Sequence, residues 1–170
     1  HTGKSRTYIL DVADDYAARK ILSSVKFMNG DGEIEEDYAI VHLMILRKAC
    51  CKRAFLRGAF LCAGSISEPE KSYHFEIVCM TPERAQQICD MMKTFNIDGK
   101  CITRKKYHVV YIKEASQIVD MLNVMEAHVS LMELENIRIL KEMRNSVNRR
   151  VNCETANISK TVSAAVKQIE

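Results

Sequence analysis

The 170-residue chain contains no tryptophan, only two prolines and six glycines, and no apolar run near the roughly 18 residues that a membrane span needs. So little proline and glycine is atypical of a disordered protein. No Cys-x-x-Cys pair occurs, and the five histidines do not cluster with the seven cysteines. We therefore predict no metal, no cofactor and no membrane partner. Unpaired cysteines acting as small hydrophobes are typical of the reducing cytoplasm.

Basic charge is present, and it is concentrated in the second half of the chain. The net charge is +3, but residues 100–170 hold 12 basic and 8 acidic groups, whereas residues 1–99 hold 13 and 14. This asymmetry favours an anionic partner without identifying it.

Periodicity and capping residues predict the order of the central elements. A helix over 47–63 ends at Gly64, and Thr81 caps a second helix that has Pro82 at its first position. The other predicted elements are hairpins at Ser65–Ser67 with Tyr73–Met80 and at Lys100–Arg104 with Tyr107–Lys113, and a helix at Glu114–Met125. The resulting order αββαββα indicates an α+β domain with an antiparallel sheet.

The flanking segments are also predicted to be ordered. We expect a strand at Arg6–Val12, a helix capped by Asp14 or Asp15, and a short helix, in preference to a strand, at Tyr38–Leu46. Helices at His128–Val147 and Asn157–Ile169 follow the central unit, and the apolar stripe of the second predicts that the native chain continues.

Small residues recur along the helix at 47–63. Ala54, Gly58 and Cys62 lie at i, i+4 and i+8, which predicts one face along which another helix can approach closely. The second half of this helix is almost wholly apolar, so we expect it to be buried on most sides.

The chain also contains the trace of an internal repeat. Tyr8–Met28 is similar to Tyr107–Met125, with Ile21 and Leu22 lying 97 residues before Ile118 and Val119. We expect a repeat whose first half lies mostly upstream.

Three stretches resemble the WhiA family: CCKRAFLRGAFLCAGSIS at 50–67, EASQIVDMLNVMEAH at 114–128 and MRNSVNRRVNCETANISKTV at 143–162. Leu56–Gly64, which reads LRGAFLCAG, aligns with the nine-residue motif of LAGLIDADG homing endonucleases. The resemblance implies a homing-endonuclease-like fold with a saddle-shaped sheet. It implies that 1–46 end a first repeat, that 47–127 form the second, and that 128–170 are a helical linker towards a helix-turn-helix expected to be absent here.

The same resemblance implies a cytoplasmic, nucleoid-associated transcription regulator of sporulation and cell division. It does not imply an enzyme. Cleavage by a LAGLIDADG domain needs a carboxylate near the end of the motif helix to hold metal. The sixth and eighth motif positions are Leu61 and Ala63, which cannot bind Mg²⁺, and Glu68 and Glu70 lie beyond them on a predicted turn.

Duplex DNA is the partner that the resemblance implies, and two basic groups are candidates to contact it. The sheet of LAGLIDADG homing endonucleases binds DNA, and by that analogy the first group is on the second hairpin. It consists of Lys100, Arg104, Lys105, Lys106 and Lys113. The second is Arg144, Arg149 and Arg150. Each group has an alternative: a solvated hairpin tip for the first, and ordering of a linker for the second. An alternative for the whole domain is a protein-interaction module that docks a partner regulator.

Overall fold

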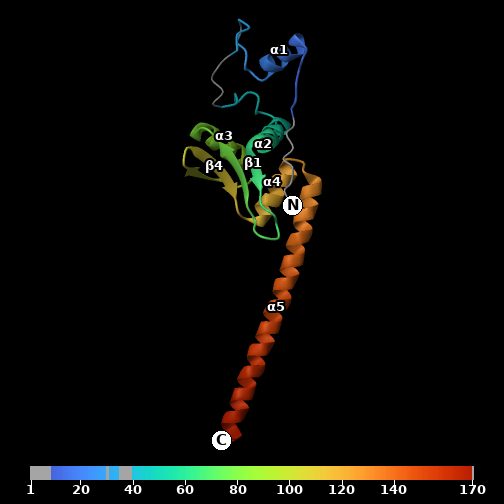
Figure 1. Ribbon diagram of the computed structural model, residues 1–170, viewed down its shortest axis with the longest axis vertical. Helices are drawn as coiled ribbons and strands as arrows, with labels where there is room; N and C mark the ends of the chain where they lie inside the picture. Colours follow the sequence, from blue (N-terminus) through green and yellow to red (C-terminus); the bar gives the residue numbers. More distant parts are fainter. Residues whose placement is uncertain (1–8, 30, 35–39, 170) are drawn as a thin grey trace.

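The computed structural model describes residues 9–29, 31–34 and 40–169 (Figure 1). Its elements are α1 (Asp15–Ser24), α2 (Ala49–Ala63), β1 (Gly64–Ile66), β2 (Phe75–Cys79), α3 (Pro82–Lys93), β3 (Lys100–Arg104), β4 (Tyr107–Ile112), α4 (Ala115–Val124) and α5 (His128–Ile169). From α2 to α4 the order is αββαββα, so the predicted α+β fold is confirmed.

The four strands form one antiparallel sheet in the order β1-β2-β4-β3. The two hairpins are joined through β2 and β4, where Phe75 pairs with Ile112 and Cys79 pairs with His108. The two strands of the second hairpin, β3 and β4, turn at Lys105, which has a φ of 54°. Because β3 pairs only with β4 among the described strands, it is an edge strand of this sheet.

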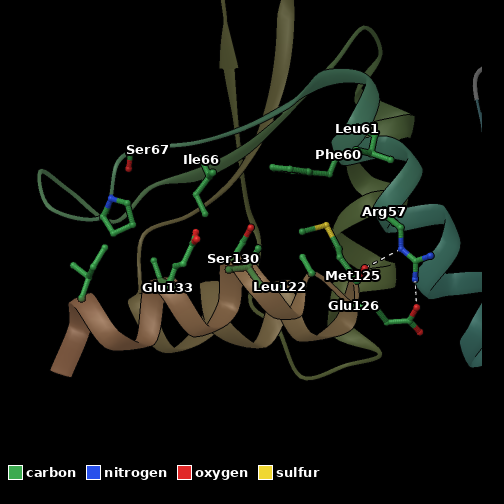
Figure 2. Close-up of a pocket in the computed structure, with 14 residues that line it drawn as sticks. Arg57, Phe60, Leu61, Ile66, Ser67, Leu122, Met125, Glu126, Ser130 and Glu133 are labelled. Carbon is green, nitrogen blue, oxygen red and sulfur yellow. Dashed lines mark hydrogen bonds and ion pairs between the residues drawn. The ribbon is translucent and has the colours of Figure 1, made fainter. Parts of the chain in front are cut away.

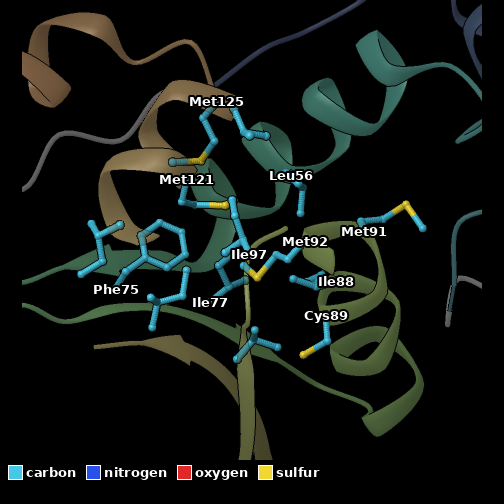
Figure 3. Packing of buried hydrophobic residues seen from close by; sticks show 14 of the residues in the cluster. Leu56, Phe75, Ile77, Ile88, Cys89, Met91, Met92, Ile97, Met121 and Met125 are labelled. Atoms are coloured by element: carbon cyan, nitrogen blue, oxygen red, sulfur yellow. The ribbon is translucent and has the colours of Figure 1, made fainter. Parts of the chain in front are cut away.

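One face of the sheet carries the core. Phe75, Ile77 and Cys79 alternate along β2 and are at most 2% exposed, and Val110 and Ile112 continue this face on β4. Helices α2, α3 and α4 all bury side chains against it (Figure 3). We call the opposite side the open face. By strand register and alternation it consists of Ser65, His74, Glu76, Val78, Lys100, Ile102, Arg104, Tyr107, Val109 and Tyr111.

Local capping signals are confirmed. The Asp14 side chain accepts a hydrogen bond of 2.7 Å from Ala17 N, and the Thr81 hydroxyl accepts one of 3.3 Å from Arg84 N. Helix α2 stops at Gly64 as predicted, but with an extended φ of −93°. A Cβ at Gly64 would lie 2.6 Å from the Phe60 carbonyl oxygen. Glycine is required there by a close approach and not by a left-handed conformation.

Two predictions near the N-terminus are wrong where the structure describes them. Residues 6–8 of the predicted strand and 38–39 of the predicted short helix lie outside the described residues. Ile9 to Val12 form no strand, because no described strand runs beside them to take their hydrogen bonds. Residues 43–46 form turns and no helix, and the N–H and carbonyl of Val41 are both bound by the Gln87 side chain.

Helices α1 and α4 resemble each other in length, in their N-caps and in the residue conformation just past their C-termini. Each has ten residues, and Asp14 and Glu114 occupy their N-caps. Just past each helix, Lys26 and Glu126 have φ values of 61° and 60°. These equivalences lie 100 residues apart, so the interval of 97 is wrong. They support an internal repeat, and the boundaries 1–46, 47–127 and 128–170 stay a prediction.

Helix α5 is continuous over 42 residues, so the prediction of two separate helices is wrong. The intervening stretch 148–156 contains no proline or glycine, and nothing in it interrupts helical hydrogen bonding. From residue 142 to 168 every residue is exposed, and this part of α5 projects away from the sheet domain (Figure 1).

Candidate nucleic-acid interface

The β3–β4 hairpin gathers the first group of predicted basic residues. Lys100 begins β3 where β4 ends, and with Lys113 and Tyr111 it lines a cavity of about 500 Å³. Arg104, Lys105 and Lys106 lie at the opposite end of the hairpin, around its turn. The five charges are therefore spread along the β3–β4 hairpin, and Asp98 and Glu114 line the same cavity as Lys100 and Lys113.

Two lysines of the hairpin lie against tyrosines of the open face. Lys106 Nζ is 5.3 Å from the centroid of the Tyr107 ring, and Lys113 Nζ is 5.5 Å from that of Tyr111. Such cation–π contacts hold the lysine stems along the sheet while the ammonium groups stay exposed. This arrangement suits a rigid anionic ligand that lies along the hairpin.

A polar network that the sequence analysis missed lies on the open face. Arg104 Nη1 is 3.2 Å from Glu76 Oε2, and His74 Nε2 is 3.0 Å from the same oxygen. The Ser65 hydroxyl donates to Glu76 Oε1 at 3.2 Å. The hydrogen bond with His74, more than any other contact, lowers the pKa of the Glu76 carboxyl below its usual value. Alternation along Tyr73-His74-Phe75-Glu76-Ile77 was the signal that could have placed His74 and Glu76 together.

The second group of basic residues is on a different part of the molecule. Arg144, Arg149 and Arg150 are exposed on the projecting part of α5. Because a helix turns by about 100° per residue, they point in three directions and form no single stripe. The nearby Lys141 instead binds within the domain, donating to the Pro69 carbonyl at 2.6 Å with Nζ 4.9 Å from the Tyr73 ring centroid.

The face of small residues on α2 is exposed. Ala54, Gly58 and Cys62 are all exposed, and a Cβ at Gly58 would meet no atom within 4 Å. Within α2 only Leu56 is fully buried, and Leu61 is 77% exposed, so the expectation of burial on most sides is wrong for this chain. No described segment covers the face, and the close approach of another helix stays a prediction.

An apolar groove adjoins the C-terminal half of α2. It has a volume of about 550 Å³, and its walls come from α2, β1, α4 and α5 (Figure 2). Phe60, Leu61, Ile66, Met125 and Leu134 line it. At one end Arg57 donates to the Met125 carbonyl at 2.8 Å and forms an ion pair with Glu126 at 2.5 Å.

The groups that metal-dependent cleavage would need are not brought together in the described part of the chain. Helix α2 ends at Ala63, and Glu68 on the following turn pairs with Lys71 at 2.5 Å. No group of three His, Cys, Asp or Glu side chains there is arranged to hold a metal ion. Burial raises the pKa of the Cys89 thiol to about 11, which is the opposite of what an activated nucleophile needs. No described helix is long and apolar enough to span a membrane.

Comparison with known proteins decides the family. Residues 52–144 match the WhiA LAGLIDADG-like domain, and residues 147–170 match the WhiA C-terminal HTH domain. The chain belongs to the WhiA family. The expectation that the helix-turn-helix is absent is therefore corrected, since the last 24 residues match its family model, and those that the structure describes lie in α5.

Relatives within the WhiA family are close. The probable cell division protein WhiA of Lachnoclostridium phytofermentans is 60% identical over 138 residues, covering 81% of this chain and 44% of that protein. The protein of the same name from Alkaliphilus oremlandii is 49% identical over 98% of this chain and 52% of its own length. The chain thus spans about half the length of these relatives.

A solved structure supports the fold as well. The crystal structure of full-length WhiA from Thermatoga maritima is 28% identical, with a TM-score of 0.61 over 77% of this chain and 46% of that one. The LAGLIDADG-like fold implied by the sequence is confirmed.

Proposed function

We propose that this chain is the DNA-associated part of a bacterial regulator of cell division and sporulation, which binds duplex DNA through the hairpin and open face of its sheet and does not cleave it. The observation that carries the proposal is the charge of this surface. The four strands contain a single acidic residue, Glu76, and that carboxylate is paired with Arg104. The protein acts in the cytoplasm at the nucleoid.

Shape and chemistry both support binding to duplex DNA. The major groove of B-DNA admits a two-stranded β-ribbon, and the β3–β4 hairpin is such a ribbon at the edge of the sheet. Lys105 and Lys106 at its turn are exposed and suit phosphate contacts. Cleavage is not part of the proposal, because Ala63 stands where the motif helix would need a carboxylate for Mg²⁺.

A salt titration tests this function. We would follow fluorescence anisotropy of a labelled duplex from about 25 to 300 mM salt, because neutralised phosphates release counterions and make affinity fall steeply with salt. Lys106→Ala should reduce the slope of log affinity against log salt by about one. Lys20→Ala, which removes the same charge from α1, is the matched control and should leave the slope unchanged. Added Mg²⁺ should produce no cleavage.

A second candidate is a protein-interaction module that docks a partner regulator. The apolar groove beside α2 favours it, since a mostly apolar concavity of this size is typical of a binding site. The region matched by the HTH domain would then read DNA. Duplex binding whose affinity and salt slope are unchanged in Lys106→Ala would contradict the first proposal and favour the second.

A further inference from the structure

We propose that Arg104 reads guanine in the DNA groove, and that Glu76 is the positioning residue that holds its guanidinium over the sheet. The inference rests on the proposed function and deepens it by separating a base-reading residue from the phosphate-binding lysines. It starts from the ion pair between these two side chains across the open face.

The strand order makes this ion pair unusual. Arg104 ends the edge strand β3, whereas Glu76 is on β2, and β4 lies between them. Arg104 pairs with Tyr107, but the β4 residue opposite Glu76 is Tyr111. The arginine side chain must therefore extend diagonally across β4 to reach the carboxylate. Without Glu76 it would be free to turn from the edge strand into solvent.

The Arg104 side chain is more exposed than that of Glu76, as recognition of a base by Arg104 requires. The Glu76 side chain is 21% exposed, and the Arg104 side chain is 55% exposed. Glu76 is itself held by Ser65 and His74 from the sheet side of the network. The carboxylate is thus a recessed anchor, and the guanidinium is the accessible group.

The chemistry of the pair favours a base edge over a phosphate. A guanidinium has five N–H donors, and the contact of Nη1 with Glu76 leaves the others for a ligand. Guanine presents two acceptors, O6 and N7, in the major groove, and arginine binds them in a bidentate manner. The Glu76 carboxylate repels a fully charged phosphate that approaches Arg104 more strongly than it repels the partially charged acceptors of a neutral base.

The lysines at the turn contrast with this arrangement. Among the described residues no carboxylate forms an ion pair with Lys105 or Lys106, and Lys106 lies over the Tyr107 ring. Their full charge suits the phosphates on either side of the groove. An arginine that is already held in place also loses less conformational freedom when it binds, which favours discrimination of guanine from the other bases.

The proposal predicts opposite effects on affinity and on selectivity. Glu76→Gln keeps the shape of the side chain and removes its charge. Overall affinity for duplex DNA should rise, because the repulsion of phosphates is lost. Preference for guanine should fall, because a neutral amide holds the guanidinium less firmly than the carboxylate does. A residue that only stabilised the fold would lower both.

The experiment selects duplexes from a library with a randomised central segment, using the whole chain. Wild type, Glu76→Gln, Arg104→Met and the control Glu83→Gln are compared, the last making the same charge change on α3, away from the open face. Anisotropy is then measured with the selected duplex and with one in which 7-deazaguanine removes N7 at the enriched position. Circular dichroism melts check that all four proteins are folded.

We expect wild type and Glu83→Gln to lose about tenfold or more in affinity with 7-deazaguanine, whereas Arg104→Met, which has no donor at this position, and Glu76→Gln lose little. No DNA binding by the wild type would refute the proposed function itself. Salt-dependent binding with no guanine enriched, or with the same loss in Arg104→Met as in wild type, would overturn only the assignment of Arg104. An unchanged preference in Glu76→Gln would overturn the positioning role of Glu76.

Discussion

Two glycines, Gly58 within α2 and Gly64 at its C-cap, offer the sharpest test of the fold, because the same substitution should have opposite effects at each. At Gly64 a new Cβ would lie 2.6 Å from the Phe60 carbonyl oxygen and 2.7 Å from Cγ of its ring. Real Cβ contacts are essentially never below 3.0 Å. At Gly58 the new Cβ would meet no atom within 4 Å.

The cost at Gly64 follows from what holds Phe60. Its ring stacks on that of Phe75 with centroids 4.9 Å apart and an interplanar angle of 13°, and Phe75 is fully buried. The ring cannot move away without disturbing the core, and the carbonyl belongs to the helix. Overpacking of this kind costs about 1–3 kcal/mol. Gly58→Ala should instead stabilise the chain by about 0.5–1 kcal/mol, because alanine loses less backbone entropy in a helix.

Thermal unfolding of the two variants measures the difference. In a chain of this length each kcal/mol shifts Tm by roughly 2–4 °C. Gly58→Ala should therefore raise Tm by a few degrees, and Gly64→Ala should lower it. A lower Tm for Gly58→Ala would refute the reasoning, and it would mean that a partner helix covers the face formed with Ala54 and Cys62.

Two further predictions concern buried polar groups. Gln87→Leu leaves the N–H and carbonyl of Val41 without the bonds of 2.9 and 2.6 Å that they now make, and should cost at least about 1–3 kcal/mol in urea unfolding. The control Gln86→Leu, on the exposed side of α3, should change little; equal losses would contradict the role of Gln87. The raised pKa of Cys89 should make stability fall between pH 9 and 11, because the unfolded thiol ionises from 9.0 and the folded one only near 11. The free energy of unfolding should keep the full contribution of the protonated thiol below that range and be lower by on the order of 2–3 kcal/mol above it. Cys89→Ala should remove this dependence on pH, and an unchanged dependence in that variant would contradict the role of Cys89.

Predictions made from neighbouring residues succeeded where the structure depends on neighbours. Thr81 and Pro82 start α3 because a cap and a fixed φ act within one turn. The same reasoning failed at residues 40–46, where Gln87, far along the chain, takes the hydrogen bonds of Val41. It failed again at α5, because two apolar stripes do not show whether the polar stretch between them is helical.

The candidate site was predicted in part. The hairpin lysines and Arg104 were found from charge and from the resemblance, and their role in DNA binding stays a proposal. Glu76 was missed, since one acidic residue within a strand has no distinguishing local pattern. Its partner Arg104 is 28 residues away in the chain.

The sequence by itself determined the family, the order αββαββα and the positions where most helices start, because caps, turns and periodicity act over a few residues. Only the tertiary structure decided which charges meet. The order β1-β2-β4-β3 places Glu76 and Arg104 on one face with β4 between them. The projection of α5 carries its arginines away from the sheet domain (Figure 1), and helix packing leaves the small-residue face of α2 exposed. These outcomes depend on long-range strand pairing and helix packing, which local sequence patterns do not encode.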